Sequence, residues 1–118
     1  MFEANFIQLS KPSISSREIK NVEKVLLGGY LGMGPETNLF ESHLSDFFNR
    51  QVVCTSSGTS ALHIALQSIK SSNKKIDEVL VSSLTFAASF QAITGAGLRP
   101  ISCDVNPKSL NICFKEIQ

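Results

Sequence analysis

A hydroxyl-rich segment, residues 56–60 (Ser-Ser-Gly-Thr-Ser), stands between a short apolar run and a helical pattern. The first amides of a helix have no intrahelical acceptor and lie at the positive end of its dipole, so they can donate to a phosphate. Gly58 allows close backbone approach, but the segment lacks the Gly-x-Gly-x-x-Gly pattern of a dinucleotide site. The segment therefore predicts an anion site at Gly58, Thr59 and Ser60, with helix capping by Ser57 or Thr59 as the alternative.

One aromatic residue follows the next predicted strand. Phe86 comes shortly after Val79–Ser82, and open α/β sheets bind ligands outside the carboxyl ends of their strands. We therefore expect Phe86 and the hydroxyl-rich segment to line one pocket, where the ring could stack on a planar ligand. The alternative is core packing, because eight of the nine aromatic residues are Phe.

The other reactive side chains form no catalytic or metal-ligating pattern. Neither His43 nor His63 has the spacing of a Ser/His/Asp or metal site, and we expect His63 to be a partly buried helix residue. Asp104 ends a predicted strand and is interpreted as structural.

Composition excludes several classes of protein. The 118 residues are 42% hydrophobic and 18% charged with a formal net charge of +1, which is typical of one soluble domain. Without a basic cluster or an apolar run of about 20 residues, neither nucleic acid nor a membrane is expected as a partner. Met1–Ser10 has no basic n-region, so we expect no signal peptide. Three cysteines without a close pair indicate reduced thiols and a cytoplasmic location.

Two helices are predicted before the hydroxyl-rich segment. Ser15 to Glu18 has the spacing of a capping box and begins a helix that ends at Gly28-Gly29. Residues 28–35 hold four glycines and a proline and predict a flexible loop, which lacks the ending of a P-loop. Apolar residues at helical spacing then predict a second helix: Leu39, Phe40, Leu44, Phe47 and Phe48.

From Gln51 onward, short apolar runs alternate with helical patterns, which is typical of parallel βα units. We predict three strands, each apolar enough for burial on both faces: Val52–Thr55, Val79–Ser82 and Ile101–Val105.

Helices are predicted between these strands. The first carries an apolar stripe from Ala61 to Ile69, and the second begins at Ala87 and ends at Gly95 or Gly97. Three lysines flank a Ser-Ser-Asn stretch and predict a solvated loop: Lys70, Lys74 and Lys75.

Taken together, these motifs resemble the N-terminal part of the DegT/DnrJ/EryC1/StrS aminotransferases, pyridoxal-phosphate enzymes that put amino groups on nucleotide-linked keto-sugars. The resemblance covers nearly the whole chain. It rests on Leu9-Ser10-Lys11-Pro12, Gly32-Met33-Gly34-Pro35-Glu36 with Phe40-Glu41, Ser57-Gly58-Thr59-Ser60-Ala61-Leu62-His63-Ile64-Ala65-Leu66, Glu78-Val79-Leu80-Val81, Leu84-Thr85-Phe86 and Pro100-Ile101-Ser102-Cys103-Asp104-Val105.

This resemblance implies a truncated α/β fold of the aspartate aminotransferase-like type I. Residues 1–118 would form the N-terminal helices and first βα units of the large domain, without the C-terminal domain. Thr59 and Ser60 would bind the phosphate of pyridoxal 5'-phosphate, largely through backbone amides, and Phe86 would stack on its pyridine ring. The first strand, Val52–Thr55, would be separated from the other two by strands encoded later.

The implied activity is amino transfer from an amino-acid donor, with glutamate expected, to a nucleotide-linked keto-sugar by a full-length homodimer. The Schiff-base lysine and the carboxylate that pairs the pyridine nitrogen would lie beyond Gln118, since none of the eight lysines stands in the family's lysine motif. This chain alone is therefore expected to be catalytically silent, and no catalytic residue is assigned within it.

Three alternatives stay open: a non-catalytic fragment or remnant, the lysine-free branch with pyridoxamine-dependent sugar dehydration, and a phosphate-binding module of flavodoxin or Rossmann type.

Overall fold

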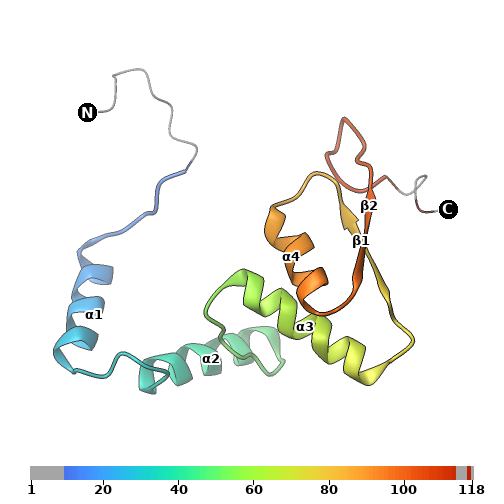
Figure 1. Ribbon diagram of the computed structural model, residues 1–118. Coiled ribbons are helices and arrows are strands. Elements are labelled where there is room, and N and C mark those ends of the chain that lie inside the picture. The colour runs from blue at the N-terminus through green and yellow to red at the C-terminus, as the bar shows by residue number, and fades with distance from the viewer. Residues whose placement is uncertain (1–9, 114–116, 118) are drawn as a thin grey trace. The chain divides into compact units, whose positions relative to one another are not determined.

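The computed structural model describes residues 10–113 and 117 (Figure 1). The expectation for Met1–Ser10 therefore lies, apart from Ser10, outside the described residues. The chain divides into two compact units, Met1–Val52 and Val53–Gln118. No helix among the described residues is long and apolar enough to cross a membrane.

The first unit contains helices α1 (Ser16–Leu27) and α2 (Pro35–Phe48). The predicted capping box is confirmed: the amide of Arg17 donates to Ser15 Oγ at 3.2 Å, and the amide of Ser15 donates to Glu18 Oε2 at 2.7 Å. The helix ends at Gly28 as expected. The next residue, Gly29, has a φ of 71°, a left-handed conformation that glycine adopts without steric conflict.

The glycine-rich connection between the two helices is shorter than expected, because α2 begins at Pro35. Proline is favoured in the first turn of a helix, where its missing N–H is not needed. Within the connection, the Tyr30 hydroxyl donates to the Met33 carbonyl at 3.2 Å. A Lys24–Glu36 ion pair at 3.7 Å links the two helices.

The second unit contains α3 (Gly58–Ser72), β1 (Glu78–Ser82), α4 (Ala87–Gly95) and β2 (Arg99–Cys103). The strands are parallel, with pairing from Glu78↔Arg99 to Ser82↔Cys103, and α4 forms the crossover between them. Both predicted helices and the second and third predicted strands are thus present.

A small core holds this unit together. Its buried residues come from β1, from α4 and from the turn into β2: Val81, Ile93, Ala96 and Leu98. Half-buried residues from α3, β1 and α4, including Leu66 and Phe90, pack against it. Burial at this core is what positions α3 and α4 in the unit.

Two expectations about the positions of the strands are wrong. Val52–Thr55 is not a strand, and Val53 is 68% exposed; the sheet in the described part of the chain is formed by β1 and β2. The third predicted strand, Ile101–Val105, is shifted by two residues: β2 runs from Arg99 to Cys103 and includes Pro100, which an edge strand tolerates.

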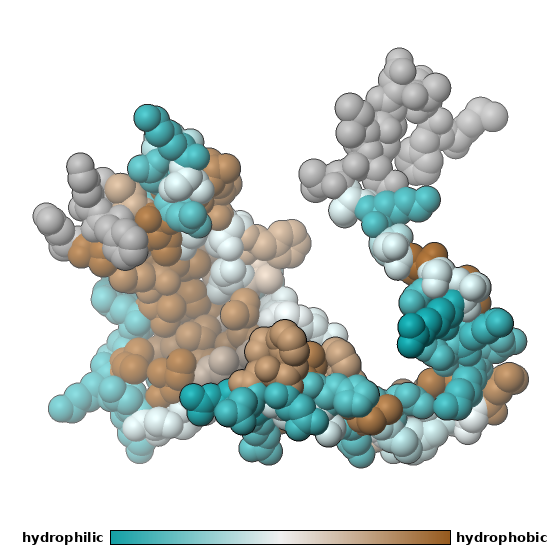
Figure 2. All heavy atoms as spheres, turned by 180° about the vertical axis from the view of Figure 1, so that it is seen from behind, coloured by the Kyte–Doolittle hydropathy of each residue, from teal (hydrophilic) through white to brown (hydrophobic). Residues whose placement is uncertain are grey.

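The sequence also predicted strands that are buried on both faces, and the structure does not show this. Along β1, Val81 is buried while its neighbour Leu80 is 48% exposed, since α4 packs against the sheet and alternate residues point to opposite faces. Figure 2 shows apolar side chains, in brown, gathered on the surface of the second unit.

Candidate functional site

The turn before α3 is organised by its own hydroxyl groups. Ser57 is the N-cap, in an extended conformation, and its Oγ accepts from the amide of Ser60 at 3.1 Å. Thr55 Oγ1 donates to the Ser57 carbonyl at 2.9 Å, which fixes the chain just before the cap. Capping by Ser57, one alternative drawn from the sequence, is therefore present, while Thr59 is not the cap.

Capping leaves several donors at the same turn. Among the described residues, the amides of Gly58 and Thr59 have no acceptor, and the first turn of α3 carries no acidic residue. The hydroxyls of Ser56 and Ser57 lie 3.2 and 3.0 Å from Ser60 Oγ. A Cβ built on Gly58 would meet nothing within 4 Å, so the turn is open to a ligand. This donor set suits a phosphate.

Two details of this turn differ from the sequence interpretation. The Ser60 amide is already bonded to Ser57, so Ser60 offers a hydroxyl rather than an amide. Ser56 joins the hydroxyl cluster although the sequence did not single it out. Its position directly before the N-cap Ser57 is the signal that could have found it.

Phe86 is the N-cap residue of α4 and its side chain is 83% exposed. Core packing within the described residues, the alternative drawn from the sequence, is therefore wrong. Thr85 Oγ1 and Ser89 Oγ lie 3.1 Å apart beside it. The exposed ring follows the carboxyl end of β1 and is available to cover one face of a planar ligand.

The structure brings Gly58, Thr59 and Ser60 into one turn, whereas Phe86 has no hydrogen bond or ring contact to that turn among the described residues. The link between them is indirect. Each lies at the N-terminal end of a helix, and those two helices, α3 and α4, pack against each other.

The remaining candidates lie outside the turn. His63 is half-buried in α3, as expected, and its Nε2 is buried with no hydrogen-bond partner in the part of the chain that the structure describes. Asp104 Oδ1 accepts from the Val105 amide at 2.7 Å. No cluster of His, Cys, Asp and Glu that could hold a metal ion occurs within residues 10–113 and 117.

Lys70 differs from its expected place in a solvated loop. It lies in the last turn of α3, is half-buried, and its Nζ donates to the Gly97 carbonyl at 2.5 Å. The sequence did not reveal this contact because the two residues are 27 positions apart.

Comparison with curated proteins finds one relative named as a sugar aminotransferase and one named for polysaccharide biosynthesis. The chain is 33% identical over 114 residues to the dTDP-4-dehydro-2,3,6-trideoxy-D-glucose 4-aminotransferase of Saccharopolyspora spinosa, covering 94% of the chain and 29% of that protein. It is 34% identical over 112 residues to the spore coat polysaccharide biosynthesis protein SpsC of Bacillus subtilis, covering 92% and 28%. The chain thus spans less than a third of the length of these relatives.

Solved structures agree with these matches. The sugar aminotransferase CalS13 from Micromonospora echinospora matches with a TM-score of 0.81 at 32% identity, over 95% of this chain and 30% of that one. The PLP form of Spr1654 from Streptococcus pneumoniae also matches with a TM-score of 0.81, at 30% identity, over 94% and 28%. The expected α/β fold is confirmed, and this chain covers less than a third of each matched structure.

The model of the DegT/DnrJ/EryC1/StrS aminotransferase family matches residues 12–118. That range includes both helices of the first unit and every element of the second. The chain therefore belongs to the DegT/DnrJ/EryC1/StrS aminotransferase family.

Proposed function

We propose that the full-length protein is a pyridoxal-phosphate-dependent sugar aminotransferase, and that residues 1–118 are the N-terminal portion of its large domain. The observation that carries the proposal is the open turn at the start of α3, which offers two unpaired amides and a group of hydroxyls in a chain of this family. Such a turn binds a phosphate group without any further charged residue.

Pyridoxal 5'-phosphate, when bound, supplies the electron sink for amino transfer. In this proposal the amides of Gly58 and Thr59 and the Ser60 hydroxyl hold the phosphate. Phe86 covers one face of the ring, which orients the cofactor and excludes water from that face. The Schiff-base lysine and the partner of the pyridine nitrogen are proposed to lie outside residues 1–118.

We propose an amino-acid donor, glutamate, and a nucleotide-linked keto-sugar as substrates. The S. spinosa relative is named for a dTDP-linked dehydro-sugar, which supports a nucleotide-linked acceptor. A homodimer in the cytoplasm completes the proposal. The three cysteines of the sequence, which form no close pair, support a reducing compartment.

Reconstitution of the full-length protein tests this function. Pyridoxal phosphate should bind with a change in its visible absorption, and glutamate should then convert the bound cofactor to its amino form. Adding nucleotide-linked keto-sugars should regenerate the original spectrum and yield an amino-sugar. Binding of the cofactor without any exchange with amino acids would contradict the aminotransferase assignment and favour the lysine-free dehydratase branch.

A further inference from the structure

Helix α3 packs against α4 more than against any other element of its unit. Four half-buried residues of α3 recur at helical spacing and so share one face: Thr59, His63, Leu66 and Lys70. Thr59 belongs to the proposed phosphate site, and Lys70 lies at the opposite end of the same face. The orientation of this face therefore decides where the phosphate site lies.

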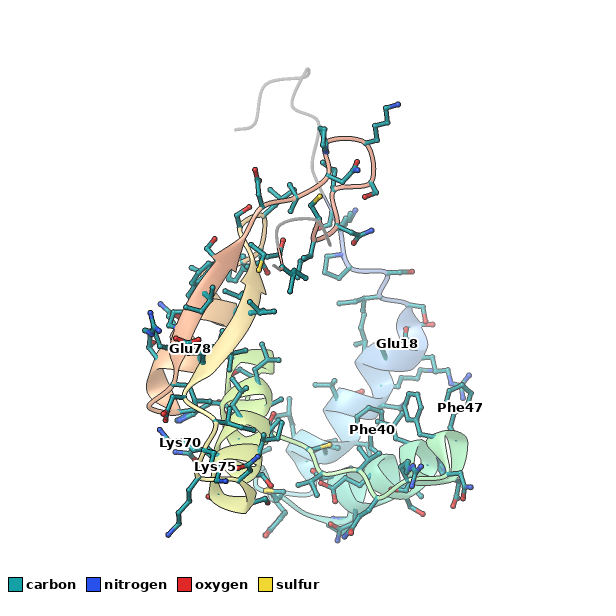
Figure 3. All side chains as sticks on the ribbon, turned by 90° about the vertical axis from the view of Figure 1, so that its right-hand side faces the viewer. Glu18, Phe40, Phe47, Lys70, Lys75 and Glu78 are labelled. Atoms are coloured by element: carbon teal, nitrogen blue, oxygen red, sulfur yellow. The ribbon has the colours of Figure 1, made fainter. Side chains whose placement is uncertain are left out.

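Contacts along the face follow in order from the middle of α3 to its end. The His63 ring lies beside Gly95 of α4, since a Cβ on Gly95 would be 3.5 Å from His63 Nε2. Leu66 packs against the buried core. Lys70 Nζ donates to the Gly97 carbonyl. Figure 3 shows Lys70 at the same end of the unit as Glu78, where the strands begin.

Of these three contacts, only the one from Lys70 is a hydrogen bond with a charged donor. Helix α4 has no basic residue in its last turn, although its C-terminal carbonyls carry partial negative charge. Lys70 supplies that cation from another helix, and it also stands in the last turn of α3. Gly97 has a φ of 69°, and a Cβ there would lie 3.3 Å from Lys70 Nζ, so the glycine permits the close approach.

The hydrogen bond from Lys70 fixes the C-terminal end of α3, and this limits how far its N-terminal end can move. Thr59 and Lys70 are eleven positions apart, which is about 16 Å along a helix, so a tilt of about 10° would move the first turn by about 3 Å. A displacement of even about 1 Å can impair a site that depends on alignment.

We propose that Lys70 is a positioning residue for the cofactor. Its bond to the Gly97 carbonyl fixes α3 against α4 and so holds the phosphate-binding turn in place relative to Phe86. This inference rests on the proposed function, because the turn and Phe86 are the two halves of the proposed cofactor site.

The test uses the full-length protein with three variants. Lys70→Met keeps the aliphatic stem and removes the donor, whereas Lys70→Arg restores a cationic donor. Lys74→Met is the matched control, since Lys74 is exposed and makes no hydrogen bond among the described residues. Ser15→Ala, in the capping box of α1, controls for a general loss of stability.

Pyridoxal-phosphate affinity is measured by absorbance titration well below the unfolding temperature, together with the visible circular dichroism of the bound cofactor. Hydrogen exchange of residues 95–98 reports the contact itself. We expect Lys70→Met to weaken affinity by at least about threefold, to change the dichroism and to speed exchange at residues 95–98. Lys70→Arg should recover most of the affinity, and both controls should bind as the parent does.

Unchanged affinity and dichroism in Lys70→Met would overturn the inference, as would an equal loss of affinity in Ser15→Ala. If the parent protein itself fails to bind pyridoxal phosphate, the proposed function is wrong and the inference falls with it. That result differs from one in which the parent binds pyridoxal phosphate and only the variants lack the expected differences in affinity and dichroism.

Discussion

The amide of Ser60 is bonded to the hydroxyl of Ser57, and this single bond divides the donors at the start of α3 into two groups. One group stabilises the helix end. The other, the amides of Gly58 and Thr59, has no acceptor among the described residues. Stability and ligand binding at this turn should therefore respond to different substitutions.

Ser57→Ala should destabilise the protein, because the Ser60 amide loses its acceptor. The expected loss in the free energy of unfolding is about 1 kcal/mol. Urea denaturation measures it, with Ser68→Ala on the exposed side of the same helix as the control. Equal stability of the two variants would show that the cap does not contribute.

Ser60→Asp should weaken pyridoxal-phosphate binding by at least about tenfold, because a carboxylate would face the phosphate. The same charge in the first turn of α3 should leave helix stability intact, since it lies near the positive end of the dipole. Absorbance titration of the full-length protein checks the affinity. Ser68→Asp, the control with the same charge change, should bind normally; if both variants lose affinity alike, the phosphate does not lie at this turn.

Phe86→Ala should lower cofactor affinity by about tenfold, the expected value of one ring-stacking contact. Because the side chain is 83% exposed, the midpoint of thermal unfolding should hardly change. Phe90→Ala, in the same helix, removes a ring that packs against the core and should cost about 2 kcal/mol or more. A Phe86→Ala protein that is destabilised yet binds the cofactor normally would contradict the stacking role.

Acid should weaken the start of α1. The hydrogen bond from the Ser15 side chain, followed by that from the Ser15 amide, lowers the pKa of Glu18 below its ordinary value of 4.5. A lowered pKa in the folded state means that this stabilisation is present above pH 4.5 and is lost as the pH falls through the folded-state pKa. Amide exchange at α1 across this pH range measures it. Glu18→Gln should remove this pH dependence and Glu23→Gln should retain it.

The 118-residue chain by itself should be poorly stable. Residues 52–55 do not form a strand, and the sheet in the described part of the chain consists of β1 and β2 alone. With a typical folding free energy of only about 5–15 kcal/mol, such open backbone and apolar surface leaves little margin. Hydrogen exchange should show weak protection at residues 52–55. Strong cooperative protection there and in β1 and β2 of a monomer would contradict this expectation.

Helix ends could be predicted from the sequence because their determinants are local. Ser15, Glu18 and Gly28 lie within one turn of the helix ends that they cap, so their spacing was enough to predict where α1 begins and ends. Whether residues 52–55 form a strand could not be predicted in the same way, since a strand also needs a neighbouring strand to pair with.

At the candidate site, contacts between residues far apart in the sequence could not be predicted either. The turn at Gly58 and Thr59 follows from the sequence because it is a strand-like run leading into a capped helix. The bond from Lys70 to Gly97 does not follow, because it depends on how α3 packs against α4. The exposure of Phe86 likewise depends on where α4 begins.

The parallel pairing of β1 and β2 also sets an order of events during synthesis. Ser82 pairs with Cys103, so β1 must wait for about 20 further residues, or about 1–4 s of translation, before its partner leaves the ribosome. A parallel pair cannot close as a hairpin, so the whole crossover through α4 must be synthesised before the strands can meet. During that interval the nascent β1 has no strand to pair with, so its backbone groups are open to association with other chains.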